Sequence, residues 1–323
     1  MIERMKILIG YDGSECAEAA LDDLKRAGLP PNVDANILTI AEVWLPPAPS
    51  RDEIVEKAEE VKVPADLQRL YSRTAAVVKE AQATVMRARD RLRASFPEWN
   101  ITAKAETGSP AWELIFRAGE LKPDLIVMGS HGRSAIGRFV LGSISQKVLT
   151  EAACSVRIAR GRVEEPDGPV RIVVGIDGSP GSMEAVRSVA SRNWPAGSEV
   201  SLVVVTDPWK VPVVGSLIPQ LAETIEEENK AESAYAGKIA GEAEAMFSGT
   251  SVKVTRVLKD GDPKHVLPGF AEEWGADCIF VGSTGFSNRL EKLVLGSVSA
   301  AVTARAHCSV EVVRSSVIDP KRE

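Results

Sequence analysis

The sequence carries the segment Lys6-Ile-Leu-Ile-Gly-Tyr-Asp-Gly-Ser14 near its start and repeats it as Arg171-Ile-Val-Val-Gly-Ile-Asp-Gly-Ser179. Each copy is an apolar run that ends in Asp-Gly-Ser, which is typical of a buried strand followed by a turn and a helix N-cap. Because the segment recurs at roughly half the chain length, it predicts a tandem duplication of one strand-and-helix domain.

Four further segments repeat in the same order and cover nearly the whole of each copy. They are Gly108–Pro110 with Gly261–Pro263, Pro123–Ser130 with Ala276–Ser283, Leu141–Ser145 with Leu295–Ser299, and Ala153–Arg160 with His307–Arg314. The junction between the copies is short, charged and proline-bearing, as an exposed linker is. We therefore predict one domain over residues 1–162, a linker over 163–168, a second domain over 169–316 and a flexible tail over 317–323.

Each copy alternates apolar, strand-like runs with helix-favouring runs. The expected strands are 6–10, 35–43, 101–106, 125–128 and 155–159 in the first copy, and 170–176, 200–206, 252–258, 278–281 and 310–313 in the second. Five strands that alternate with four helices predict the α/β class. The expected fold is two tandem doubly wound domains, each a five-stranded parallel sheet in the order 3-2-1-4-5 with helices on both faces.

Composition and charge narrow the class of protein. The 323 residues are 44% hydrophobic and 26% charged, with a net charge of −6. This acidic balance argues against non-specific nucleic-acid binding and against a basic membrane footprint. The start lacks a signal-peptide pattern, and no stretch approaches the roughly 20 apolar residues of a membrane-spanning helix. Four cysteines without metal-binding spacing indicate reduced, mostly buried thiols, so we expect a cytoplasmic protein with neither a nucleic-acid nor a membrane partner.

The residues with the strongest chemical signal follow the predicted strands. Gly129-Ser-His-Gly132 and Gly282-Ser-Thr-Gly285 follow the fourth strand of each copy, and Gly142-Ser143 and Gly296-Ser297 open the next helix. We expect these glycines to reach positive φ and to let the backbone approach a ligand. Backbone N–H groups at a helix N-terminus, with a serine hydroxyl at the cap, suit phosphate.

Two side chains near this loop leave alternatives open. Asp12 ends the first strand, as Asp177 does in the second copy, and its carboxylate suits either a ribose hydroxyl or a metal ion. His131 is interpreted either as a phosphate contact or as an exposed loop residue.

The spaced motif Gly129-x2-Gly132-x9-Gly142-Ser143, opposite a strand that ends in Asp12-Gly-Ser14, resembles the universal stress protein family, in its tandem form and its ATP-binding branch. The resemblance implies that ATP, with Mg²⁺, is the ligand. In the first copy it implies nucleotide contacts at Asp12, Ile40, Met128, Gly129, Gly132, Arg133, Gly142, Ser143 and Ile144. In the second copy the matching residues are Asp177, Val205, Val281, Gly282, Gly285, Gly296, Ser297 and Val298.

The resemblance also implies that the last strands of the two copies, Ser155–Ala159 and Val310–Val313, pair within one chain as an internal pseudo-dimer. A homodimer of the whole chain stays open as a further assembly.

The two copies are not equivalent. The offset between them is 165 at Asp12 and Asp177 but 153 at Gly129 and Gly282, so the first copy carries extra residues within 44–95. The second glycine loop encloses ten residues before Gly296, where the first encloses nine. The second copy also replaces His131 and Arg133 by Thr284 and Phe286. The first copy is therefore the stronger candidate for a nucleotide site.

The leading hypothesis is an ATP-binding regulatory protein of the stress response. The alternatives are an enzyme on the same platform, such as a slow ATPase, a self-phosphorylating protein or an adenylyl transferase, and a second domain whose empty site acts as a scaffold. The sequence lacks a Gly-x4-Gly-Lys-Ser/Thr loop and the kinase motifs. It therefore contains only part of the set of residues that phosphoryl transfer requires. We assign no catalytic residue, and the metal ligands stay undetermined.

Overall fold

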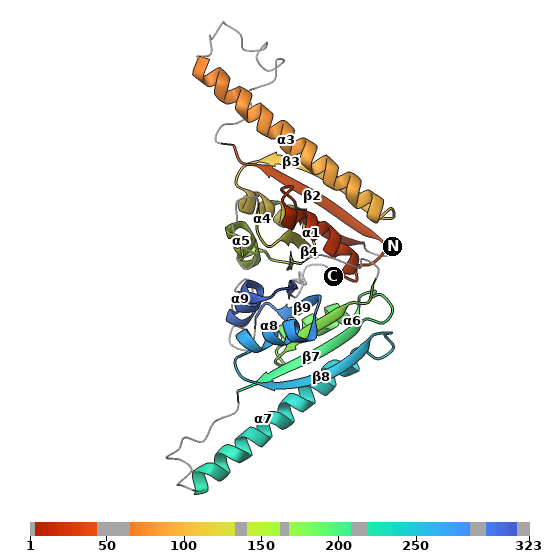
Figure 1. Cartoon of the computed structure of the whole chain (residues 1–323), viewed down its shortest axis with the longest axis vertical. Coiled ribbons are helices and arrows are strands. Elements are labelled where there is room, and N and C mark those ends of the chain that lie inside the picture. Colours follow the sequence, from red (N-terminus) through yellow and green to blue (C-terminus); the bar gives the residue numbers. More distant parts are fainter. Residues whose placement is uncertain are drawn as a thin grey trace, which may run out of the picture.

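The computed structural model of the chain describes residues 4–43, 65–132, 141–161, 168–207, 219–284 and 295–314. Figure 1 shows two α/β units stacked along the long axis of the molecule. The strands of the first copy are β1 (Met5–Gly10), β2 (Val33–Ala41), β3 (Asn100–Thr107), β4 (Leu125–Gly129) and β5 (Ser155–Ala159). Those of the second copy are β6 (Arg171–Ile176), β7 (Glu199–Thr206), β8 (Lys253–Asp260), β9 (Cys278–Gly282) and β10 (Ser309–Val313).

Helices connect these strands in both copies. In the first copy they are α1 (Glu15–Asp23), the short 3₁₀ helix η1 (Leu24–Arg26), α3 (Ala65–Ser95), α4 (Pro110–Leu121) and α5 (Ser143–Glu151). In the second copy they are α6 (Pro180–Ala190), α7 (Pro219–Ala245), α8 (Pro263–Trp274) and α9 (Ser297–Arg305). None of the helices in the described ranges combines the length and the apolar character that a membrane crossing requires.

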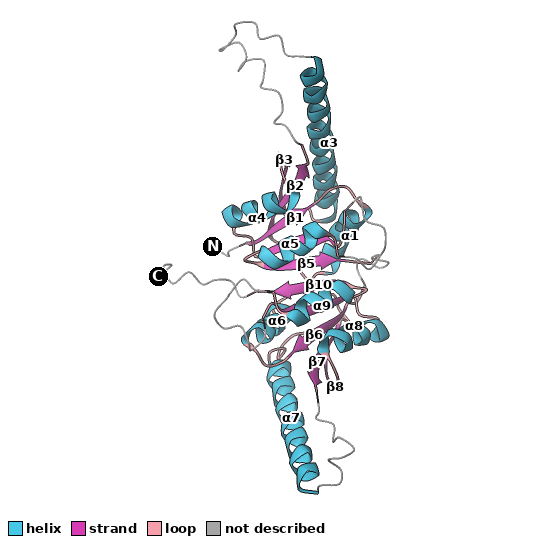
Figure 2. Ribbon diagram, turned by 90° about the vertical axis from the view of Figure 1, so that its left-hand side faces the viewer, coloured by secondary structure: helices cyan, strands magenta, loops and turns pink. Residues whose placement is uncertain are grey.

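All ten strands belong to one sheet, in the order β3-β2-β1-β4-β5-β10-β9-β6-β7-β8. Within each copy the strands are parallel and follow the predicted order 3-2-1-4-5. The predicted pairing of the last strands is also present, because β5 and β10 lie side by side and antiparallel (Figure 2). The predicted fold class is confirmed, with a further feature: the two sheets are continuous.

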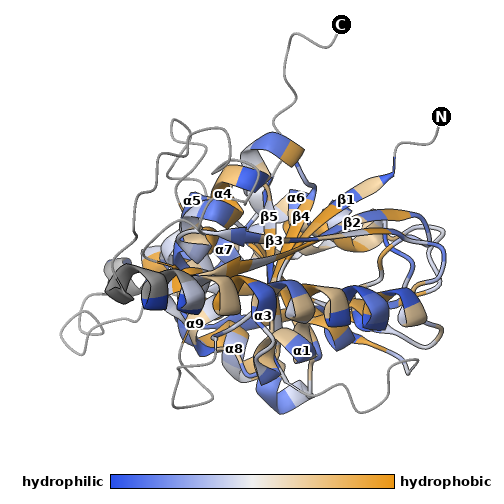
Figure 3. Ribbon diagram, turned by 90° about the horizontal axis from the view of Figure 1, so that it is seen from above, coloured by the Kyte–Doolittle hydropathy of each residue, from blue (hydrophilic) through white to orange (hydrophobic). Residues whose placement is uncertain are grey.

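The helices cover both faces of this sheet. Helices α4, α5, α8 and α9 share one apolar core that runs without interruption from the first copy into the second. On the other face, α1 and α3 cover one core and α6 and α7 cover a separate one. Viewed from above, the strands are largely hydrophobic and the helices alternate in hydropathy along their length, as expected of amphipathic helices (Figure 3).

Helices α3 and α7 lie at opposite ends of the molecule, next to the edge strands (Figures 1 and 2). Helix α3 has 31 residues and its counterpart α7 has 27, so part of the extra length of the first copy lies in α3. The rest of the expected insertion falls on residues 44–64, which lie outside the described residues.

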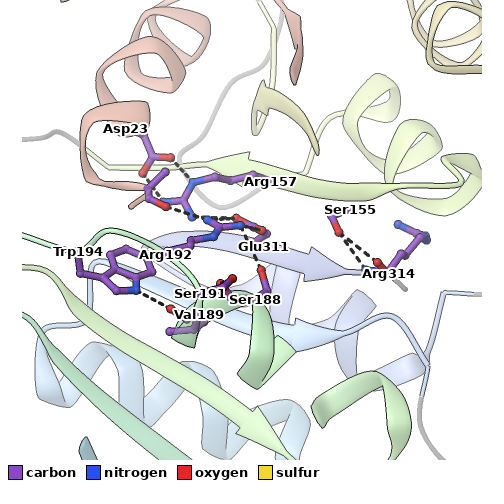
Figure 4. A network of polar contacts seen from close by, with 11 residues as sticks. Asp23, Ser155, Arg157, Ser188, Val189, Ser191, Arg192, Trp194, Glu311 and Arg314 are labelled. Carbon is purple, nitrogen blue, oxygen red and sulfur yellow. Dashed lines mark hydrogen bonds and ion pairs between the residues drawn. The ribbon is translucent and has the colours of Figure 1, made fainter. Parts of the chain in front are cut away.

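Between the two separate cores, the boundary of the two copies holds a buried network of charges (Figure 4). Arg157 on β5 stands directly opposite Glu311 on β10, and its Nη1 lies 3.3 Å from Glu311 Oε2. Arg157 also donates from Nε and Nη2 to the two carboxylate oxygens of Asp23, at 2.6 and 3.1 Å. Arg192, which follows α6, donates to both oxygens of Glu311. The two guanidinium groups flank the buried ring of Phe280, at 5.9 and 4.9 Å from its centroid.

This network makes the boundary asymmetric. Arg157 and Glu311 are equivalent positions of the two copies, so identical domains would place like charges opposite one another. The chain instead places a cation opposite an anion, and both side chains are about 1% exposed. Burial alone would lower the pKa of Arg157, but the neighbouring carboxylates, Asp23 first, raise it above its ordinary value. The first copy is therefore complementary to the second copy rather than to itself.

We expect Glu311→Gln to lower the free energy of unfolding by about 3–5 kcal/mol, because it leaves two buried guanidinium groups with one carboxylate fewer. Urea denaturation measures the change. Glu184→Gln is the matched control, since Glu184 pairs with Arg187 on the exposed surface of α6 and such pairs contribute at most about 1 kcal/mol. Equal, small effects of the two substitutions would contradict a structural role for the network.

Candidate functional site

A cavity of about 590 Å³ opens at the carboxyl ends of β1, β2 and β4 in the first copy. This is the point where the sheet continues from β1 to β2 on one side and to β4 on the other, the switch point at which open α/β sheets bind ligands. The cavity is lined by Gly10, Tyr11, Asp12, Ala17, Thr39, Ile40, Ala41, Glu42, Val77, Glu80, Ala81, Pro110, Leu114, Met128, Gly129, His131, Gly132, Gly142, Ser143, Ile144 and Ser145.

The Asp-Gly-Ser turn after β1 forms one wall of the cavity. Asp12 Oδ1 accepts a hydrogen bond of 2.9 Å from the backbone N–H of Ser14, and Ser14 Oγ in turn caps α1. Gly13 has φ of 76°, a left-handed conformation that glycine adopts without strain. The other carboxylate oxygen, Oδ2, lies 2.8 Å from where a Cβ on Gly132 would be. Asp12 thus holds the turn with one oxygen and faces the glycine loop with the other.

The N-terminus of α5 forms the opposite wall. Gly142 is the N-cap residue, and because it has no side chain it makes no side-chain cap. Its own N–H donates to the Ser130 carbonyl oxygen at 2.8 Å, and Ser145 Oγ donates to the Gly129 carbonyl oxygen at 2.9 Å. These bonds fix the first turn of α5 against the end of β4, with Ser143 lining the cavity. The positive end of a helix dipole therefore borders the cavity.

Two expectations about this loop are wrong in detail. The loop glycines were expected to reach positive φ, but Gly142 and Gly296 have φ of −64° and −65°, and Gly129, Gly132 and Gly282 also stay outside the positive-φ region. Ser143 was expected at the cap position, but it is the first helical residue after the Gly142 cap. At Gly142 and Gly296 the reason is the extended conformation of an N-cap residue, which needs no positive φ and places the serine that follows in the first turn.

Close packing, rather than φ, explains why residue 129 is glycine. A Cβ on Gly129 would lie 2.7 Å from the backbone carbonyl carbon of Cys16. The second copy repeats this approach, since a Cβ on Gly282 would lie 2.4 Å from the carbonyl carbon of Gly181. In each copy this glycine lets the first helix cross directly over the end of the fourth strand.

The lining brings together eight of the nine site residues predicted for the first copy, namely Asp12, Ile40, Met128, Gly129, Gly132, Gly142, Ser143 and Ile144. The ninth, Arg133, lies outside the described residues, as does Gly285 of the second copy. The two segments whose lengths differ, nine residues after Gly132 and ten after Gly285, therefore also lie almost entirely outside the described residues.

The second copy repeats the backbone plan of the site. Asp177 Oδ1 accepts from the N–H of Ser179 at 2.9 Å, and Gly296 caps α9 without a side-chain bond. Asp177 is exposed, whereas Asp12 is half-buried. The other predicted residues keep the places of their counterparts: Val205 is in β7, Val281 and Gly282 end β9, and Ser297 and Val298 begin α9.

Several lining residues were not foreseen from the sequence. Val77, Glu80 and Ala81 come from α3, whose helical spacing of three and four residues places them on one face. That spacing was visible in the sequence, but it did not indicate which part of the fold the face would contact. Thr39 was also missed, and its hydroxyl donates to the Tyr11 carbonyl oxygen at 2.7 Å, joining β2 to the turn after β1.

The described residues contain no group of three or more His, Cys, Asp or Glu side chains arranged to hold a metal ion.

Comparison with known proteins agrees with the repeat. The model of the universal stress protein family matches residues 3–160 and again residues 170–314. A universal stress protein of Methanocaldococcus jannaschii is 34% identical over 153 residues, which cover 47% of this chain and 84% of that protein. A universal stress protein of Mycolicibacterium smegmatis is 31% identical over 192 residues, 59% of this chain and 61% of that protein.

The tandem fold also has a solved counterpart. The crystal structure of a universal stress protein from Archaeoglobus fulgidus superposes with a TM-score of 0.63 at 19% identity, covering 96% of this chain and 98% of that one. At this identity the likeness concerns the fold.

We expect Gly129→Ala to lower the free energy of unfolding by about 1–3 kcal/mol, because its Cβ would overlap the backbone of α1. Gly119→Ala is the matched control. Gly119 lies within α4 with open space around it, so alanine should stabilise by about 0.5–1 kcal/mol through helix propensity. Thermal or urea unfolding of the two variants should therefore give shifts of opposite sign, and a neutral Gly129→Ala would refute the packing requirement.

Proposed function

The chain belongs to the universal stress protein family, and we propose that its first copy binds ATP in the cavity at the carboxyl ends of β1, β2 and β4. The observation that carries the proposal is the pairing, across one cavity, of a helix N-terminus that has no side-chain cap with a half-buried aspartate. The volume, about 590 Å³, is within the range of small-molecule sites.

The phosphate groups would lie against the start of α5. Gly132 and Gly142 present backbone without side chains there, and the first amides of the helix carry the positive end of its dipole. The hydroxyl of the exposed Ser143 adds a donor at the same place.

The base and the sugar would occupy the rest of the cavity. Ile40, Val77, Leu114 and Met128 supply the apolar surface that an adenine ring requires. The backbone of Ile40 lies near the end of β2, where it can meet the polar edge of the base, and Asp12 Oδ2 suits the ribose hydroxyls.

Magnesium would arrive with the nucleotide. The described residues provide no ready-made cage of ligands, whereas the phosphates of ATP supply the oxygens that Mg²⁺ prefers, commonly completed by one carboxylate and water. Asp12 and Ser143 line the cavity beside the proposed phosphate position, and we propose that their oxygens complete the set; the carboxylates of Glu42 and Glu80 also line the cavity.

The lining favours binding over phosphoryl transfer. Among the described lining residues, which do not include Arg133, there is no lysine or arginine, and transfer of a phosphoryl group requires cations that stabilise the transferring oxygens. We therefore propose a regulatory role, in which the protein responds to the level of ATP, and place the principal site in the first copy.

We expect Gly142→Val to abolish ATP binding at the first site. The branched side chain would project where phosphate should lie, and its Cβ would already be 3.2 Å from the Cα of His131. Isothermal titration calorimetry with Mg·ATP measures the affinity and the number of sites. Gly296→Val makes the same change at the equivalent cap of the second copy, where the Cβ meets Ser283 at 3.1 Å, and it should leave one site intact.

Circular dichroism of both valine variants establishes that they are folded. Unchanged ATP affinity in a folded Gly142→Val protein would contradict the assignment, as would the absence of any binding to the unaltered chain at millimolar ATP. Mass spectrometry of nucleotide carried through purification gives an independent measurement on the same protein.

A further inference from the structure

A thiol and an imidazole meet beside the cavity of the first copy. Cys16 Sγ lies 3.2 Å from His131 Nε2, and His131 Nδ1 lies 3.0 Å from Ser130 Oγ. When the imidazole carries its hydrogen on Nδ1, that group donates to the Ser130 hydroxyl and the Nε2 lone pair points to the thiol. This is the order of groups that activates a cysteine nucleophile: thiol, base and a partner that orients the base.

Charged groups of both signs lie around Cys16. Cys16 is in the first turn of α1, at the positive end of the helix dipole, and the same turn carries the carboxylates of Glu15 and Glu18. The guanidinium group of Arg160 is within electrostatic range of this sulfur and, more strongly, of the sulfur of Cys308. Cys16 is half-buried and not enclosed in the core.

The second copy shows that the fold does not require this pair. Its equivalent positions are Gly181 and Thr284, and the same turn and the same crossing of helix over strand form there. A thiol and an imidazole in contact are therefore an addition to the first copy and not a condition of its architecture.

The other three cysteines differ in that burial raises the pKa of each thiol. Burial raises the pKa of Cys154 to about 11 and that of Cys308 to about 12, and it raises the pKa of the fully buried Cys278 as well. At neutral pH these thiols are protonated, and a protonated thiol is a poor nucleophile.

We propose that Cys16 and His131 form a reactive thiol site that exchanges with small, soluble disulfides. His131 Nε2 takes the proton of the thiol, and the Cys16 thiolate attacks one sulfur of the disulfide. A bond forms between Cys16 Sγ and that sulfur, the original sulfur–sulfur bond breaks, and the second half leaves as a thiolate that recovers the proton from His131. Cys16 is oxidised to a mixed disulfide and the small disulfide is reduced to one thiol.

The test uses the intact chain and 5,5′-dithiobis(2-nitrobenzoic acid), an aromatic disulfide whose released thiolate absorbs visible light. At pH 7 we expect one thiol equivalent per chain to react fast, with Cys16→Ser removing this phase and Cys308→Ser leaving it. His131→Asn should slow the phase by about tenfold or more at pH 7. The difference should shrink near pH 9.5, where the thiol ionises without a base. Peptide mapping after treatment with glutathione disulfide should place the adduct on Cys16.

A fast phase that persists in Cys16→Ser would overturn the proposal. Equal rates for His131→Asn and the unaltered protein at pH 7 would do the same. Slowing by the same factor at both pH values would also refute it, because that result indicates a change of access and not the loss of a base. Circular dichroism verifies that each variant is folded, and none of these measurements requires nucleotide.

Discussion

The antiparallel pairing of β5 with β10 is the contact on which the whole molecule depends. It joins two five-stranded sheets into one, removes an exposed edge from each of them and makes one apolar core continuous across both copies. Arg157 on β5 and Glu311 on β10 are buried opposite one another, so this pairing requires a cation from one copy and an anion from the other. Buried charges tolerate only complementary neighbours, so the boundary selects the other copy and disfavours a like one.

The cavity follows from the same topology at a smaller scale. Parallel strands direct their carboxyl ends to one edge of the sheet, and β2 and β4 lie on opposite sides of β1. Space opens between the helices that return on either face. Residues in its wall serve the fold first. Asp12 closes a turn, Gly129 admits the backbone of α1, and Gly142 caps α5. Groups of the wall that these structural contacts do not use, such as Asp12 Oδ2 and the Ser143 hydroxyl, face the cavity.

The two copies share one architecture and differ in the side chains near the glycine loop. The turn after the first strand and the glycine cap of the last helix, α5 or α9, have the same geometry in both copies. The side chains around them differ, since Cys16 and His131 stand where the second copy has Gly181 and Thr284. The backbone is therefore the conserved framework within this chain, and the side chains near the cavity distinguish the copies.

The sequence by itself determined the repeat, the order of strands and helices, and the turns that close on Asp12 and Ser14, because these depend on local patterns of apolar and turn-forming residues. Only the tertiary structure decided the charge network around Arg157, the part of α3 that faces the cavity, and the contact of Cys16 with His131. Each of those joins residues far apart in the chain, and periodicity reports which face of an element is apolar, not which distant side chain it will meet.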